Sequence, residues 1–211
     1  MTFRITGLAG LALLTAGLAS AALVTTTPVG GTTTTFPGGT GIFSGPGAGT
    51  VAGFPITYTS GVVYDYDGGF GMGDNGSWDW GMIGINTSTG AMTIDLGGLY
   101  SSVGGFMNYS PDNGDATISA IAADGTTILE SYVLSTVAPI STPGATNGGA
   151  YRGIERLLSE IRYFRIENSY LGMHDITLDG RGASAIPEPS TVILTIPAAF
   201  ALWWRRRRSA A

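Results

Sequence analysis

The chain of 211 residues contains no cysteine, no lysine and a single histidine, His174. Without cysteine it forms no disulfide, performs no thiol chemistry and holds no cysteine-ligated zinc. The single histidine also excludes a zinc site built from two or three histidines. A domain of this composition must therefore be stabilised by its own core.

Charged residues are scarce as well, at 12% of the chain, whereas glycine accounts for 34 residues. Five of the ten arginines, but only one of the fifteen acidic residues, lie in terminal segments that we expect to be removed. The remainder has five arginines and fourteen acids, which gives a net charge of −9. Such a surface repels phosphate backbones, so no nucleic-acid partner is expected, whereas divalent cations and neutral sugars are compatible with it.

The N-terminal segment, residues 1 to 21, has the three parts of a secretory signal peptide. Arg4 supplies the positive charge, residues 5 to 18 are apolar, and Ala19-Ser20-Ala21 matches the small-residue cleavage motif. The sequence therefore predicts that signal peptidase cuts between Ala21 and Ala22 and that the chain is exported.

The C-terminal segment begins in a linker over residues 181 to 190 that contains Pro187-Glu188-Pro189. Each proline fixes φ and lacks an N–H donor, so this peptide fits neither a helix interior nor a central strand. An uncharged apolar run follows over residues 191 to 204, and a basic tail over residues 205 to 211 ends the sequence. The tail carries four consecutive arginines, Arg205, Arg206, Arg207 and Arg208.

The apolar run predicts a transmembrane helix, and the arginines predict its cytoplasmic end. Its 14 residues would rise about 21 Å as a helix, which is less than the ~30 Å hydrocarbon core of a bilayer. Pro197 interrupts the run. A short, proline-broken span suits a temporary anchor better than a permanent one.

These three features, in this order, resemble the PEP-CTERM sorting signal of Gram-negative bacteria. In that family an exosortase, a membrane-embedded cysteine protease, recognises the signal, and the cargo reaches the cell surface or the exopolysaccharide matrix. The resemblance implies membrane association before processing and cleavage near Pro187-Glu188-Pro189. An ordinary C-terminal membrane anchor with a proline-rich stalk is the alternative interpretation.

The segment between the two signals is typical of an all-β protein. Residues 22 to 50 are a low-complexity Thr/Gly/Pro lead-in, which we interpret as a flexible stalk or an irregular first strand. From 51 to 180, short apolar stretches alternate with turn sequences, and Asp124-Gly125 marks a β-hairpin. This spacing predicts an antiparallel β-sandwich. Residues 154 to 161 have helix-like spacing and predict one or two helical turns.

Residues 91 to 178 also resemble cargo domains that precede PEP-CTERM tails, which are jelly rolls of the galactose-binding type. The matching stretches are Val103-Gly104-Gly105-Phe106, residues 117 to 120, and residues 173 to 178. In the last stretch His174 replaces one of the paired acids of the family. The glycine pair predicts a close approach of backbone.

The stretch from residue 64 to 80 combines aromatic and acidic side chains. Tyr66, Trp78 and Trp80 could stack on sugars beside the carboxylates, and packing of these aromatic rings in a core or hairpin is the alternative. Calcium could bind at three acids of this stretch, although their spacing is not that of an EF-hand. These three acids are Asp65, Asp67 and Asp74.

No motif predicts an enzyme. The chain has no G-x-S-x-G sequence, and Asp175 follows His174 directly, so in a strand it would point to the other face. We therefore expect a non-enzymatic structural role at the cell surface or in a biofilm matrix, with no required cofactor. A carbohydrate-binding module using residues 64 to 80 is the alternative hypothesis.

Overall fold

The computed structural model describes residues 21–37, 40–66 and 68–180. Most of the predicted signal peptide and everything from residue 181 onward, including the predicted transmembrane segment and the basic tail, lie outside these residues. Within the described ranges, no helix is both long and apolar enough to cross a membrane.

The larger of two main sheets contains nine strands within the described residues. They are β1 (Ala22–Val24), β2 (Thr32–Thr35), β3 (Thr40–Phe43), β6 (Val62–Tyr66), β9 (Ile83–Ile85), β11 (Ser102–Asn108), β14 (Ala150–Glu155), β16 (Gly172–Met173) and β17 (Asp175–Asp179). Their order is β1-β14-β11-β16-β9-β6-β3, and β17 pairs with both β11 and β2. The pairings in this sheet are antiparallel.

The smaller main sheet has the order β13-β12-β15-β10-β5-β4 and is antiparallel as well. Its strands are β4 (Gly47–Val51), β5 (Phe54–Tyr58), β10 (Ala91–Tyr100), β12 (Thr117–Ile121), β13 (Ile128–Val133) and β15 (Ile161–Glu167). A short hairpin, a 3-10 turn and one helical turn complete the described fold. These are β7 (Phe70–Gly71) with β8 (Ser77–Trp78), η1 (Gly73–Asn75) and α1 (Leu134–Val137).

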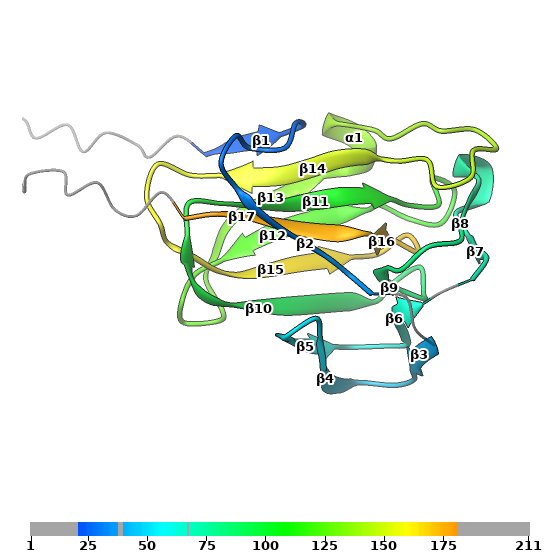
Figure 1. Ribbon diagram of the computed structural model, residues 1–211, viewed down its shortest axis with the longest axis horizontal. Coiled ribbons are helices and arrows are strands. Elements are labelled where there is room, and N and C mark those ends of the chain that lie inside the picture. Colours follow the sequence, from blue (N-terminus) through cyan, green and yellow to red (C-terminus); the bar gives the residue numbers. More distant parts are fainter. Residues whose placement is uncertain (1–20, 38–39, 67, 181–211) are drawn as a thin grey trace, which may run out of the picture.

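The two sheets stack into a sandwich with the apolar core between them (Figure 1). Strand β10 illustrates how the sequence builds it, because Met92, Ile94 and Leu96 are buried while Thr93 and Asp95 face outward. Each large side chain that is fully buried in this way contributes roughly 1.5–3 kcal/mol. The predicted all-β antiparallel sandwich is therefore confirmed.

The glycine pair of β11 lies where neighbouring backbone leaves no room for a side chain. A Cβ on Gly105 would be 2.0 Å from the carbonyl oxygen of Asp175, and one on Gly104 would be 2.6 Å from that of Arg152. The predicted close approach of backbone is confirmed. A larger residue at Gly104 would clash with β14, and one at Gly105 would clash with β16 and β17 on the other side of β11.

The predicted helical turns over residues 154 to 161 are wrong. Ile154 belongs to β14 of the larger sheet and Ile161 begins β15 of the smaller one, so this segment crosses between the sheets. Both isoleucines are buried, but Leu157 and Leu158 between them are 71% and 46% exposed. The helix-like spacing arises because two buried strand ends flank a connecting turn.

The irregular lead-in predicted over residues 22 to 50 also requires correction, because β1 to β4 lie there. Strand β1 pairs with β14, β2 with β17, and β4 with β5. The threonine repeat Thr32–Thr35 forms β2, where Thr33 Oγ1 lies 2.8 Å from Thr177 Oγ1. Polar, low-complexity sequence is thus accommodated on the surface of the larger sheet.

Candidate functional site

The two predicted processing regions adjoin one end of the sandwich. Ala22, directly after the predicted signal peptidase bond at Ala21, is the first residue of β1, and Asp179 is the last residue of β17. Glu155 pairs with both Ala22 and Ser102, and Ser102 pairs with Asp179. At about 4.8 Å per strand, the two strand ends are therefore about 14 Å apart. The processing residues Pro187, Glu188 and Pro189 and the four arginines lie outside the described residues.

Trp78, predicted as a sugar-stacking residue, is fully buried. Its exposed fraction is 0%, and it packs in a small second core with Phe70, Met72 and Met82. Its Nε1 donates a hydrogen bond to the carbonyl oxygen of Gly148 at 2.5 Å. For Trp78 the structure therefore shows the packing alternative, because a buried ring offers no face to a ligand.

Trp80 is partly exposed and lies next to the only histidine. The rings of Trp80 and His174 are stacked at 3.9 Å with an interplanar angle of 13°. His174 Nδ1 lies 2.7 Å from the carbonyl oxygen of Gly81, which can only accept, so Nδ1 carries the proton. Asp175 Oδ1 instead accepts the backbone N–H of Phe106 at 2.9 Å. His174 is thus a packing residue whose orientation is fixed by a carbonyl group.

A buried polar network, which sequence reasoning missed, joins η1 to the loop over residues 138 to 149. Asn75 Nδ2 donates to Asn108 Oδ1 and to the carbonyl oxygens of Tyr109 and Ile140 at 2.9–3.0 Å. Asn75 Oδ1 accepts the N–H of Thr142 at 3.0 Å. Asn75 and Asn108 are 3% and 0% exposed. Their amides therefore replace the backbone pairing that the long loop lacks.

Arg152 anchors the start of the same loop from β14. Its Nε and Nη2 donate to the carbonyl oxygens of Ala138 and Pro139 at 2.8 and 3.0 Å, and Nη1 donates to its own neighbour Tyr151. Burial lowers the pKa of Arg152 from its ordinary value. The loop over residues 138 to 149 is therefore held at its start by the side chain of Arg152 and further along by Asn75.

The predicted calcium ligands are only partly described. Asp74 is exposed in η1, whereas Asp67 and the side chains of Asp65 and Tyr66 lie outside the described residues. Within the described part of the chain, no three His, Asp or Glu side chains gather to hold a metal. The calcium site therefore stays a prediction.

Comparison with known proteins gives no relative of this chain. No protein-family model matches it, and neither a curated protein nor a solved structure does. Its function must therefore be argued from its own residues.

Proposed function

We propose that this chain is an exported structural protein of the cell surface or of an exopolysaccharide matrix, as in a biofilm, processed at both ends. Signal peptidase cuts between Ala21 and Ala22, and an exosortase cuts near Pro187-Glu188-Pro189. The observation that carries the proposal is the order of the C-terminal features: proline-flanked acid, apolar run, four arginines. Each has its own physical role, as an exposed peptide, a membrane segment and a cytoplasmic stop.

The placement of the domain's ends supports this proposal. The first residue of β1 and the last residue of β17 lie at the same level of the larger sheet, joined through the paired residues Glu155 and Ser102. Both membrane-directed segments therefore leave one end of the sandwich. Figure 1 shows these two strand ends on its left-hand side. A domain whose ends left opposite sides could not readily keep both segments in one bilayer.

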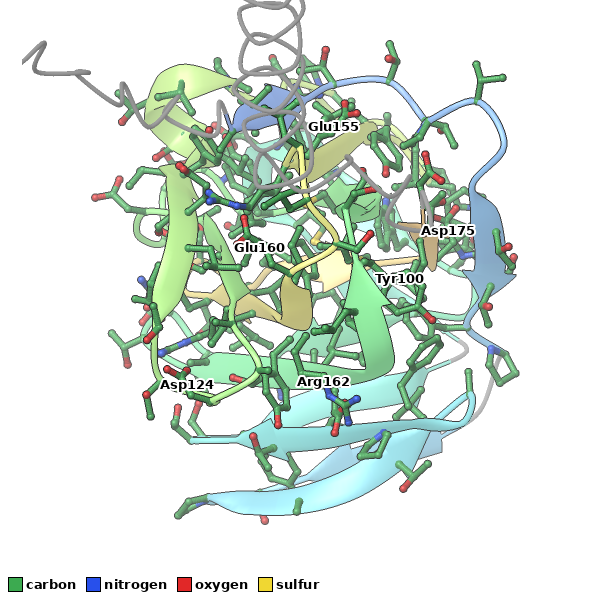
Figure 2. All side chains as sticks on the ribbon, turned by 90° about the vertical axis from the view of Figure 1, so that its left-hand side faces the viewer. Tyr100, Asp124, Glu155, Glu160, Arg162 and Asp175 are labelled. Atoms are coloured by element: carbon green, nitrogen blue, oxygen red, sulfur yellow. The ribbon has the colours of Figure 1, made fainter. Side chains whose placement is uncertain are left out.

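The turns at that end also suit a membrane-facing orientation before cleavage. Leu99, near the end of β10, is 51% exposed, and Leu157 and Leu158, in the connection between β14 and β15, are 71% and 46% exposed. Figure 2 looks onto this end, with Tyr100, Glu155 and Glu160 near these turns. The ten linker residues 181 to 190 span at most about 35 Å. The domain is therefore held close to the bilayer until the linker is cut.

We further propose a jelly roll of the galactose-binding type for the sandwich. The chain alternates between the sheets from β10 to β17, since β10, β12, β13 and β15 belong to the smaller sheet and β11, β14, β16 and β17 to the larger. A non-enzymatic role agrees with the site geometry, in which His174 stacks on Trp80 and Asp175 pairs with backbone.

The test is to express the full chain in a Gram-negative host with and without an exosortase. We expect a shorter, surface-released product only in the host with the enzyme. Replacing Pro187, Glu188 and Pro189 with alanine should leave the tail attached, whereas Arg181→Ala in the same linker should be processed. A protein that keeps its tail and stays in the membrane fraction in both hosts would refute the proposal.

A further inference from the structure

A cavity of about 350 Å³ opens on the outer face of the smaller sheet, away from the residues already discussed. Strands β5, β10 and β15 and the turn between β12 and β13 form its walls. The residues that matter to its chemistry are Pro55, Thr57, Thr93, Asp95, Gly125 and Tyr163. Its volume lies at the lower end of the range for small-molecule sites.

The strand registers explain why these side chains meet. Thr57 pairs with Thr93, and Asp95 pairs with Tyr163. Side chains alternate along a strand, so the neighbours Ile94 and Phe164 point into the sandwich core. Ile56 is buried as well and also borders the cavity. The sheet therefore places two hydroxyls, a carboxylate and a phenol ring on one surface.

Asp95 is held in a fixed orientation. Its Oδ1 accepts the N–H of Gly97 at 2.8 Å, and its Oδ2 accepts Nη2 of Arg162 at 3.0 Å. Each carboxylate oxygen has two lone-pair directions, so Oδ2 retains capacity for a further donor. Arg162 Nη2 also lies 2.9 Å from Asp95 Oδ1, so the two side chains form an ion pair.

Tyr163 provides the apolar wall. The guanidinium carbon of Arg162 lies 5.7 Å from the centroid of its ring. Gly125, at φ 73° in the hairpin turn, lies beside the ring, and a Cβ there would be 3.7 Å from it. Figure 2 shows Arg162 next to the cyan strands and Asp124 on the neighbouring turn. Because Gly125 has no side chain, the space beside the Tyr163 ring stays open on this side of the cavity.

The hydroxyls of Thr57 and Thr93 complete the polar wall. Within the part of the chain that the structure describes, neither hydroxyl forms a hydrogen bond with another protein group. Each can therefore donate to and accept from a bound molecule without breaking an existing contact.

We propose that this cavity, the sheet-face site, binds a neutral hexopyranose unit of a polysaccharide. A pyranose has an apolar C–H face that fits against Tyr163 and Pro55, and ring hydroxyls that can donate to Asp95 and pair with Thr57 and Thr93. The carboxylate and the net charge of −9 disfavour phosphate or uronate ligands. The site uses no residue of the 64–80 stretch and none of the C-terminal segment, so it stands apart from the alternative sugar site and from the sorting proposal.

The experiment is a titration of the full-length chain, purified in a sugar-free detergent, with cellotetraose, maltotetraose and mannotetraose. Binding is followed through the NMR signals of the Thr57 and Thr93 methyl groups and the Tyr163 ring. A tetramer of galacturonate serves as the anionic comparison. We expect at least one neutral tetrasaccharide to shift these signals and the galacturonate tetramer to leave them unchanged.

Substitutions of residues that line the cavity test whether the sugar binds there. Tyr163→Ala and Thr57→Val with Thr93→Val should each weaken binding by about tenfold. Thr35→Val, an exposed threonine of β2 on the other sheet, is the matched control and should bind as the unchanged chain does. Thermal unfolding of each variant confirms that it is folded.

Two results would overturn the proposal. One is the absence of any shift with all three neutral tetrasaccharides at about 10 mM, where even weak sites are occupied. The other is binding that Tyr163→Ala leaves intact, or shifts confined to Trp80. Neither result depends on whether the C-terminal tail is cut, so failure here is distinguishable from failure of the sorting proposal.

Discussion

Trp78 and Tyr163 are aromatic residues with a carboxylate nearby, but the fold uses them in opposite ways. Trp78 is 0% exposed and donates its Nε1–H to a loop carbonyl group, so it holds the 138–149 loop onto the sandwich. Tyr163 lies on the outer face of an alternating strand, where its ring lines a cavity. An aromatic residue near an acid therefore indicates a ligand site only when its partners leave a face of the ring accessible.

Substitution of Trp78 should cause the largest loss of folding stability. Trp78→Ala should lower the free energy of unfolding by about 3–5 kcal/mol, because it leaves a large cavity and removes one of the two side-chain hydrogen bonds that the Gly148 carbonyl oxygen accepts. Chemical denaturation followed by circular dichroism measures the change. Trp78→Phe, which keeps most of the ring volume but removes the donor, should lose less. A loss at Trp78→Ala below 1 kcal/mol would contradict its role in packing.

Asn75 should rank next. Asn75→Ala removes the two Nδ2 protons that three acceptors share and the bond that Oδ1 accepts, and it leaves buried groups of Asn108 and Thr142 without that partner. We expect a loss of about 2–4 kcal/mol, together with faster hydrogen exchange in residues 138 to 149. Asn113→Ala is the matched control, since Asn113 is exposed and its side chain donates to Ser110 Oγ rather than to a buried network. Equal effects of the two substitutions would exclude the network as an anchor.

Tyr163 should matter far less for stability than for binding. Tyr163→Ala removes a partly exposed ring on the sheet surface, so we expect a loss of only about 1 kcal/mol in the same denaturation assay. If Tyr163→Ala destabilised the domain as strongly as Trp78→Ala, the contrast between the two aromatic residues would be lost.

The smallest effect concerns the hairpin turn beside the sheet-face site. Hydrogen bonds from Thr127 and Thr126 lower the pKa of Asp124 to about 2. Since the folded state has the lower pKa, this carboxylate stabilises the fold above about pH 4, and the contribution is lost as pH falls toward 2. NMR titration measures the pKa directly. Thr127→Val should raise it toward 3.8, and an unchanged pKa would refute the assigned cause.

Short sequence patterns correctly predicted two features of the fold, a hairpin turn and a close approach of strands. The Asp124-Gly125 hairpin joins β12 to β13, and the glycine pair of β11 meets neighbouring backbone. The false helix at residues 154 to 161 shows the limit, because its spacing comes from two strands in different sheets. Local sequence could not distinguish this connection from a helical face.

The candidate sites were harder to predict because they depend on distant contacts. The burial of Trp78 requires Gly148, and the sheet-face site combines residues 55 to 57, 93 to 95, 125 and 163. Only the register of β5, β10 and β15 brings these positions together. By contrast, both proposed processing signals are continuous stretches of sequence, so they can be proposed without knowledge of the fold, and they stay predictions.

The most direct test of the sorting proposal is the intact mass of the protein harvested from the surface of cells that carry an exosortase. The account predicts a chain that begins at Ala22 and has lost Arg205 to Arg208, with any remaining mass assignable to groups added after cleavage. A mass that includes residues 205 to 211 would contradict it.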